Sequence, residues 1–211
     1  SDFITRPFDM KVVYRRVVNT IQLYANQRRL IDRLTRQMVE QENDSKVMTS
    51  ILSHIVEFRN GESGRHVIMI RKLTELLLKT LLLKTEEYNL TSQDVNHIIN
   101  ASALHDIGKI AIDEKIINKP GKLTKEEFET MKAHTVIGSD IIRSLKAYSG
   151  EPLLKFADEI CRYHHERWDG KGYPDGLIGD EIPIAAQVVS VADVYDALTS
   201  VRSYKPAYSS E

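Results

Sequence analysis

"CRYHHERWDGKGYPDG", residues 161–176, places two adjacent histidines shortly before a Gly-Tyr-Pro turn. His164 and His165 offer imidazole nitrogens, which in their neutral form are common metal ligands. Adjacent residues of a helix point about 100° apart, so we expect one imidazole to serve one metal ion and its neighbour to serve a second. This stretch therefore predicts a site for more than one cation.

A second polar sequence, "HDIGK" at residues 105–109, ends the apolar segment that begins at residue 92. His105 offers an imidazole and Asp106 a carboxylate able to bridge two cations, while Lys109 lies about one helical turn further on. Unpaired charge is costly in a buried helix, so these groups need a partner. We predict a metal site with a neighbouring phosphate-binding cation. A structural hydrogen bond between His105 and Asp106 is the alternative.

Four more side chains are candidate metal ligands, although the residues around each of them give a weaker signal. Glu62 and His66 are four residues apart, so a helix would place both on one face. Asp193 is a carboxylate in an apolar segment, and His134 lies on a predicted helix. A surface contact, an exposed histidine or a salt bridge would each explain one of these residues in isolation.

The distribution of proline and of apolar residues predicts an all-α fold. Residues 8–119 contain no proline, the strongest helix breaker. Apolar spacing predicts helices over residues 65–89 and 92–110, with Ser92 and Asp94 as possible caps of the second. Thr124 and Glu127 form a capping-box pattern that begins another helix. The expected domains are residues 1–28, a linker helix and hinge over 29–49, and a main domain over 50–211.

The linker helix carries an apolar stripe. Large residues recur at steps of three and four from Val17 to Met38, interrupted by Arg28. This marginal heptad pattern predicts a two-stranded coiled coil, and hence a homodimer through the N-terminal helix. A single amphipathic helix lying on its own domain is the alternative.

Composition excludes several classes of partner. The 211 residues carry a net charge of −1, so no global charge attracts a nucleic-acid polymer or an anionic membrane. The leucine-rich segment near residue 80 is interrupted by lysines, and we expect no membrane insertion. Cys161 is the only cysteine, which rules out an intramolecular disulfide framework and indicates the cytoplasm.

Taken in order, "HDIGK", the His134 helix, "HHERWDGKGYPDGL" and "VADVYDALTSVRSYK" resemble the HD-GYP family. This is a branch of the HD-domain phosphohydrolases that acts as cyclic di-GMP phosphodiesterases. The resemblance covers residues 50–208 and implies an all-helical HD-type domain with two or three divalent metal ions, iron or manganese. The implied metal ligands are Glu62, His66, His105, Asp106, His134, His164, His165 and Asp193.

The resemblance also implies the reaction and the residues that contact substrate. Metal-activated hydroxide would attack a phosphodiester of cyclic di-GMP and give linear pGpG, which a second cut would convert to GMP. The implied catalytic residues are His105, Asp106 and Lys109, and the implied substrate contacts are Lys109, Tyr173, Arg202 and Lys205. Where the family usually has Arg-Pro-Tyr, this chain has Arg202-Ser203-Tyr204, which could loosen that loop without removing its charge.

The same motifs are compatible with functions other than the hydrolysis of cyclic di-GMP. An inactive sensor of cyclic dinucleotides, an interaction module and a related HD-superfamily nucleotide phosphohydrolase are alternatives, and cyclic GMP-AMP is an alternative substrate. The start, "SDFITRPFD", resembles the last strand-to-helix turn of a response-regulator receiver domain, which implies an upstream histidine kinase. Further helices usually follow the position of Glu211 in the family, so we also consider the domain truncated at its C-terminus.

Overall fold

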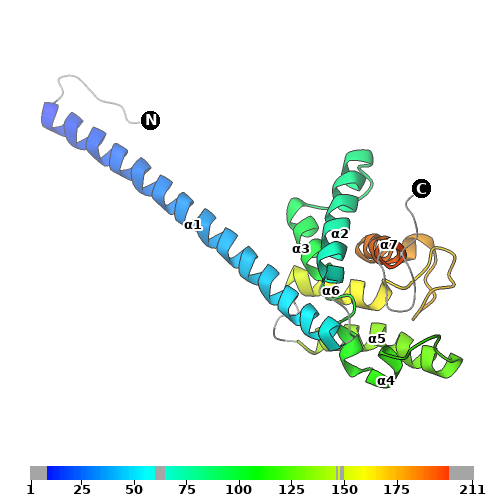
Figure 1. Cartoon of the computed structure of the whole chain (residues 1–211). Helices are drawn as coiled ribbons and strands as arrows, with labels where there is room; N and C mark the ends of the chain where they lie inside the picture. Colours follow the sequence, from blue (N-terminus) through cyan, green and yellow to red (C-terminus); the bar gives the residue numbers. More distant parts are fainter. Residues whose placement is uncertain (1–8, 60–64, 146, 148–149, 200–211) are drawn as a thin grey trace. The chain divides into compact units, whose positions relative to one another are not determined.

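The computed structural model describes residues 9–59, 65–145, 147 and 150–199, and within these ranges it contains helices and loops but no β-strand. The predicted all-α fold is confirmed, including a long N-terminal helix (Figure 1). The elements are α1 (Met10–Arg59), α2 (Arg65–Lys84), α3 (Ser92–Ser102), η1 (Ile107–Ala111), α4 (Glu114–Ile117), α5 (Lys125–Ser144), α6 (Pro152–Tyr163), η3 (Gly179–Glu181) and α7 (Ile184–Thr199).

The chain divides into two compact units, Ser1–Ser45 and Lys46–Glu211. The described part of the first unit is helical from Met10 onward, and its heptad positions are exposed to solvent. The exposed apolar residues there include Val17, Ile21, Tyr24, Ile31, Leu34 and Met38. Helix α1 continues through residues 41–47, where the polar sequence predicts a hinge. That segment contains neither glycine nor proline, the residues that most disfavour a helix.

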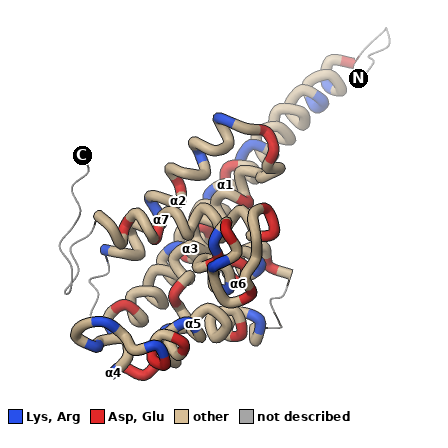
Figure 2. The backbone as a smooth tube through the Cα atoms, turned by 90° about the vertical axis from the view of Figure 1, so that its right-hand side faces the viewer, with Lys and Arg blue, Asp and Glu red and all other residues tan. Residues whose placement is uncertain are grey.

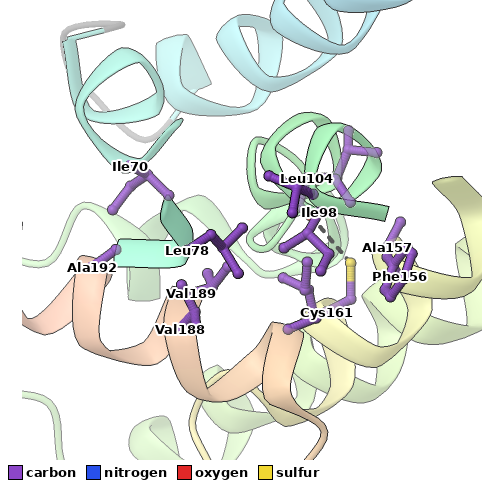
Figure 3. Close-up of a cluster of buried hydrophobic side chains, with 14 of the residues drawn as sticks. Ile70, Leu78, Ile98, Leu104, Phe156, Ala157, Cys161, Val188, Val189 and Ala192 are labelled. Carbon is purple, nitrogen blue, oxygen red and sulfur yellow. Dashed lines mark hydrogen bonds between the residues drawn. The ribbon is translucent and has the colours of Figure 1, made fainter. Parts of the chain in front are cut away.

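The second unit is built around an apolar core that α2, α3, α6 and α7 share. Figure 3 shows Ile70, Leu78, Ile98, Cys161 and Val189 gathered into one cluster, and all five are completely buried. Burying one large aliphatic side chain contributes about 1.5–3 kcal/mol. The core therefore holds these helices in fixed positions relative to one another, and two of the candidate ligands lie on them, His66 on α2 and Asp193 on α7.

Helices α3 and α5 each begin at a capping box. The expected box at Thr124 and Glu127 is confirmed at the start of α5. The expected caps Ser92 and Asp94 are partly wrong for α3, because the N-cap is Thr91 and Asp94 is its capping-box partner. Thr91 and Asp94 satisfy backbone N–H groups that have no partner within the helix.

The helix predicted over residues 92–110 is wrong in its second half. Helix α3 ends at Ser102, and a turn leads into the short 3-10 helix η1. The reason lies at Gly108, where an added Cβ would lie 1.9 Å from the backbone oxygen of His134 and 2.5 Å from the nitrogen of Gly138. Only a residue without a side chain permits this close packing of η1 on α5. That packing brings residues 105–109 against the helix that carries His134.

Charged residues of both signs occur along the second unit. The coloured backbone of Figure 2 shows Lys and Arg positions interspersed with Asp and Glu positions along α5, whereas Glu75 is the one acidic residue of α2. Among the helices of the described ranges, none combines the length and the apolar character needed to cross a membrane.

Candidate metal centre

Seven of the eight predicted metal ligands converge in two groups. Asp106, His134, His164 and His165 form one group, and His66, His105 and Asp193 form the other. Within each group, every residue offers a ligand atom within 4.8 Å of the others. The eighth residue, Glu62, lies outside the described residues.

Asp106 connects the two groups. Its Oδ2 lies 3.3 Å from Nε2 of His105, and its Oδ1 lies 3.3 Å from Nε2 of His134. His105 is in turn 3.4 Å from His66, measured between their Nε2 atoms. Each carboxylate oxygen of Asp106 therefore faces a different group, as a carboxylate that bridges two cations must.

Backbone hydrogen bonds fix the tautomers of three of the histidines. The Nδ1 atoms of His105, His134 and His164 lie 2.9, 2.7 and 2.9 Å from the carbonyl oxygens of Ser102, Met131 and Ile160. A carbonyl oxygen only accepts, so each Nδ1 carries a proton. In the neutral ring, Nε2 then keeps its lone pair. Each of the three rings, once neutral, therefore has one lone pair, at Nε2, for a metal ion.

His66 is oriented by a carboxylate that the sequence reasoning missed. Oδ2 of Asp196 lies 2.6 Å from Nδ1 of His66, and Asp196 is buried on α7. Nε2 of His66 lies 3.7 Å from Oδ1 of Asp193 on the same helix. The signal was available, because Asp196 follows Asp193 by three residues and helical residues three apart share a face. A carboxylate on the remote nitrogen is the usual support of a metal-binding histidine.

The charge state of the first group suits a cation. Burial lowers the pKa of His164 to about 3 and also lowers the pKa of His134 and His165. Burial alone would raise the pKa of Asp106, but the charges of Lys109 and His105 outweigh it and hold that pKa well below its usual value. The group therefore consists of neutral imidazoles and an ionised carboxylate, the forms that bind metals.

The second group carries a proton that a metal would displace. Burial lowers the pKa of His105, but the carboxylate of Asp106 more than offsets it and the pKa is raised to about 9. An imidazole ligand must be deprotonated, so a cation and this proton compete for His105.

One buried oxygen supports the presence of a ligand. Oδ1 of Asp106 is buried and, within the described residues, accepts no hydrogen bond. A buried carboxylate oxygen without a partner is costly. A divalent cation between Asp106 and the surrounding imidazoles would satisfy it. The residues therefore fit a divalent metal site, in both donor type and charge.

The helical geometry assumed for His164 and His165 is wrong, and the division of the pair between two ions stays a prediction. Helix α6 ends at Tyr163, His164 is its C-cap and His165 lies in the following turn. Because His165 does not continue the helix, the 100° rule does not apply to the pair. Their ring centroids are 4.1 Å apart, and both residues belong to the same group.

The turn after the paired histidines is tied to the cluster. Glu166 is buried and accepts hydrogen bonds from the N–H groups of Asp175, Gly176 and Leu177, at 2.7, 3.0 and 3.1 Å. The N–H of Tyr173 donates to the carbonyl oxygen of His165 at 3.2 Å. These contacts place the ring of Tyr173 4.8 Å from the ring of His165, between centroids.

Of the three basic side chains predicted to contact substrate, the structure describes one. Nζ of Lys109 lies 2.5 Å from Oδ2 of Asp106, at the edge of the cluster. Arg202 and Lys205 lie outside the described residues.

This fold and this cluster define a helical, metal-binding domain. The chain belongs to the HD domain family, whose sequence pattern matches residues 46–211. The resemblance to HD-GYP proteins is thereby confirmed, whereas the receiver-like start remains a prediction.

Three curated relatives illustrate the similarity. The chain is 40% identical over 174 residues to 3'3'-cGAMP-specific phosphodiesterase 2 of Vibrio cholerae, covering 82% of this chain and 31% of that protein. It is 36% identical to the cyclic di-GMP phosphodiesterase response regulator RpfG of Xanthomonas campestris pv. campestris, covering 98% and 54%. It is also 36% identical to a cyclic di-GMP phosphodiesterase of Thermotoga maritima, covering 97% and 56%. The chain thus spans between 31% and 56% of the length of these relatives.

Replacing Asp196 by alanine is expected to weaken metal binding by about 10–100-fold, because His66 loses the carboxylate that orients it. Metal content after dialysis against a graded series of chelators measures this. Asp140→Ala, an exposed change on α5, is the matched control. If Asp196→Ala and Asp140→Ala retained metal equally, Asp196 would have no role in positioning His66.

Proposed function

We propose that this domain hydrolyses a phosphodiester bond of cyclic di-GMP to give linear pGpG, and in a second cut GMP, with two or three divalent ions. The position of Asp106 between two groups of ligands carries this proposal. A pair of metal ions in such a site supplies a deprotonated water near neutral pH and stabilises the charge on the attacking and leaving oxygens.

Iron or manganese is the proposed metal. Imidazole and carboxylate donors suit both ions, and they also suit zinc and nickel. The family resemblance favours iron and manganese within that set, and Glu62 would complete a third position.

The residues of the chain bind and orient the substrate around this site. The ammonium of Lys109 lies beside Asp106, where it can neutralise a non-bridging phosphate oxygen. Tyr173 lies against His165 and so at the edge of the cluster, where a nucleotide would contact it. Arg202 and Lys205 are proposed to bind the phosphates and guanine edges of the same ligand.

Hydrolysis of 3'3'-cyclic GMP-AMP is the second candidate, because a relative that is 40% identical has that activity in its name. The two substrates share the phosphodiester chemistry and differ in one base. The choice between them therefore depends on base recognition rather than on the metal site.

Incubation of the metal-loaded protein with each nucleotide under reducing conditions tests the function. We expect linear pGpG from cyclic di-GMP. Faster cleavage of cyclic GMP-AMP would favour the second candidate. Tight binding of cyclic di-GMP without cleavage, by protein that holds its metal, would instead identify a sensor.

We further propose that the protein is a cytoplasmic homodimer, paired through the exposed heptad stripe of residues 17–38, and that a receiver domain couples it to a histidine kinase. The similarity to a response regulator supports the coupling. A solution mass of two chains is expected by sedimentation equilibrium, and a monomer at high concentration would contradict the pairing.

A further inference from the structure

Two aromatic rings and an ammonium form a small cluster at the start of α5, outside the metal centre. The ring centroids of Phe128 and Tyr173 are 6.3 Å apart, with an interplanar angle of 82°. Nζ of Lys132 lies 5.3 Å from the centroid of Phe128 and 5.6 Å from that of Tyr173. Lys132 therefore occupies the corner between the two rings, and Phe128 is 46% exposed to solvent.

This cluster adjoins the candidate metal centre directly. The ring of Tyr173 lies 4.8 Å from that of His165, which belongs to the group around Asp106. Phe128 and Lys132 are one turn apart on α5, the helix that also carries His134. A nucleotide whose phosphate reached the metal centre would thus have an exposed aromatic ring and a cation within reach of its base.

The carboxylate of Glu129 and the ammonium of Lys132 are complementary to the hydrogen-bonding edge of guanine. Oε1 of Glu129 lies 2.7 Å from Nζ of Lys132, so an acceptor and a donor stand next to each other. Guanine presents acceptors at O6 and N7 and donors at N1 and N2, and its O6 and N1–H are neighbours. A lysine can donate to O6 and N7 while the carboxylate accepts from N1–H and N2–H. Adenine has an amino group in place of O6, which would face the ammonium as donor to donor.

We propose that Phe128, Glu129 and Lys132 form a base subsite that selects guanine over adenine in a cyclic dinucleotide. Phe128 provides the stacking surface, and the Glu129–Lys132 pair reads the base edge. The proposal rests on the proposed function for the identity of the ligand class. It adds the residues that decide which cyclic dinucleotide is preferred.

Binding rather than turnover tests the subsite. The probes are the slowly hydrolysed bisphosphorothioate forms of cyclic di-GMP and cyclic di-AMP, titrated calorimetrically into the metal-loaded protein. Lys132→Met should reduce the preference for the guanine form about tenfold, because it removes the donor to O6 and N7. Phe128→Ala should weaken both forms by a similar factor, roughly fivefold or more, because stacking does not depend on the base.

Lys125→Met, an exposed lysine at the start of the same helix, is the matched control and should change neither affinity. Metal content verifies that each variant keeps its site. An unchanged guanine preference in Lys132→Met, with metal retained, would overturn the subsite and leave the proposed hydrolysis intact. If the wild-type protein bound the guanine form selectively but never cleaved cyclic di-GMP, the hydrolysis would fail and the subsite would stand. Binding of neither probe would overturn both.

Discussion

Replacing Asp106 by asparagine is expected to remove bound metal and to lower kcat by at least about 10³-fold, since metal ions supply several kcal/mol of transition-state stabilisation. Asparagine keeps the volume of Asp106 but carries no charge and cannot present an anionic oxygen to each group. Asp106 is the residue whose two oxygens face both groups, so both should lose affinity. Metal content and initial rates on cyclic di-GMP measure the effect.

Asp140→Asn is the matched control, since it makes the same chemical change at an exposed position on α5. Circular dichroism of both variants checks that the helices remain folded. Wild-type hydrolysis by a folded Asp106→Asn protein would show that the reaction does not use this cluster.

Replacing Lys109 by methionine is expected to keep the metal and to lower kcat by about 10²–10³-fold, the usual effect of removing one donor to a developing oxyanion. Lys109 contacts Asp106 through its ammonium but is not a member of either ligand group. Its loss therefore removes charge stabilisation at the phosphate without removing a ligand. Metal content and kcat, measured on the same sample, separate the two effects.

Lys115→Met, at an exposed position in α4, should behave as wild type. If Lys109→Met lost its metal together with its activity, Lys109 would act by holding Asp106 in place. In that case its proposed contact with the phosphate would be wrong.

The fold could be predicted because its signals are local. Spacing of apolar residues at three and four, the absence of proline and the capping box at Thr124 each act within one or two helical turns, and α5 begins where that box predicts. The exception is residues 103–110, where apolar periodicity predicts helix. Close packing of Gly108 on the backbone of α5 ends the helix there, and no local pattern reveals such a long-range contact.

The candidate site could be predicted in part. The sequence identifies residue types that bind metals, and the structure brings seven of the eight together, although their role as ligands remains a prediction. The spacing of Asp196 from Asp193 places it on the same face of α7, but its contact with His66, 130 residues away in the chain, is not visible in the sequence. The grouping of His164 with His165 depends on where α6 ends. Both features are set by tertiary packing, which one sequence without its structure does not contain.

The metal content of the purified chain tests the central claim most directly. Protein reconstituted with iron or manganese under reducing conditions, then freed of loosely bound ions, should retain two or three ions per chain by elemental analysis. His105→Ala, prepared in parallel, should retain fewer. Folded wild-type protein that held less than one ion per chain would contradict the account, because the converging imidazoles and carboxylates would then have no cation to bind.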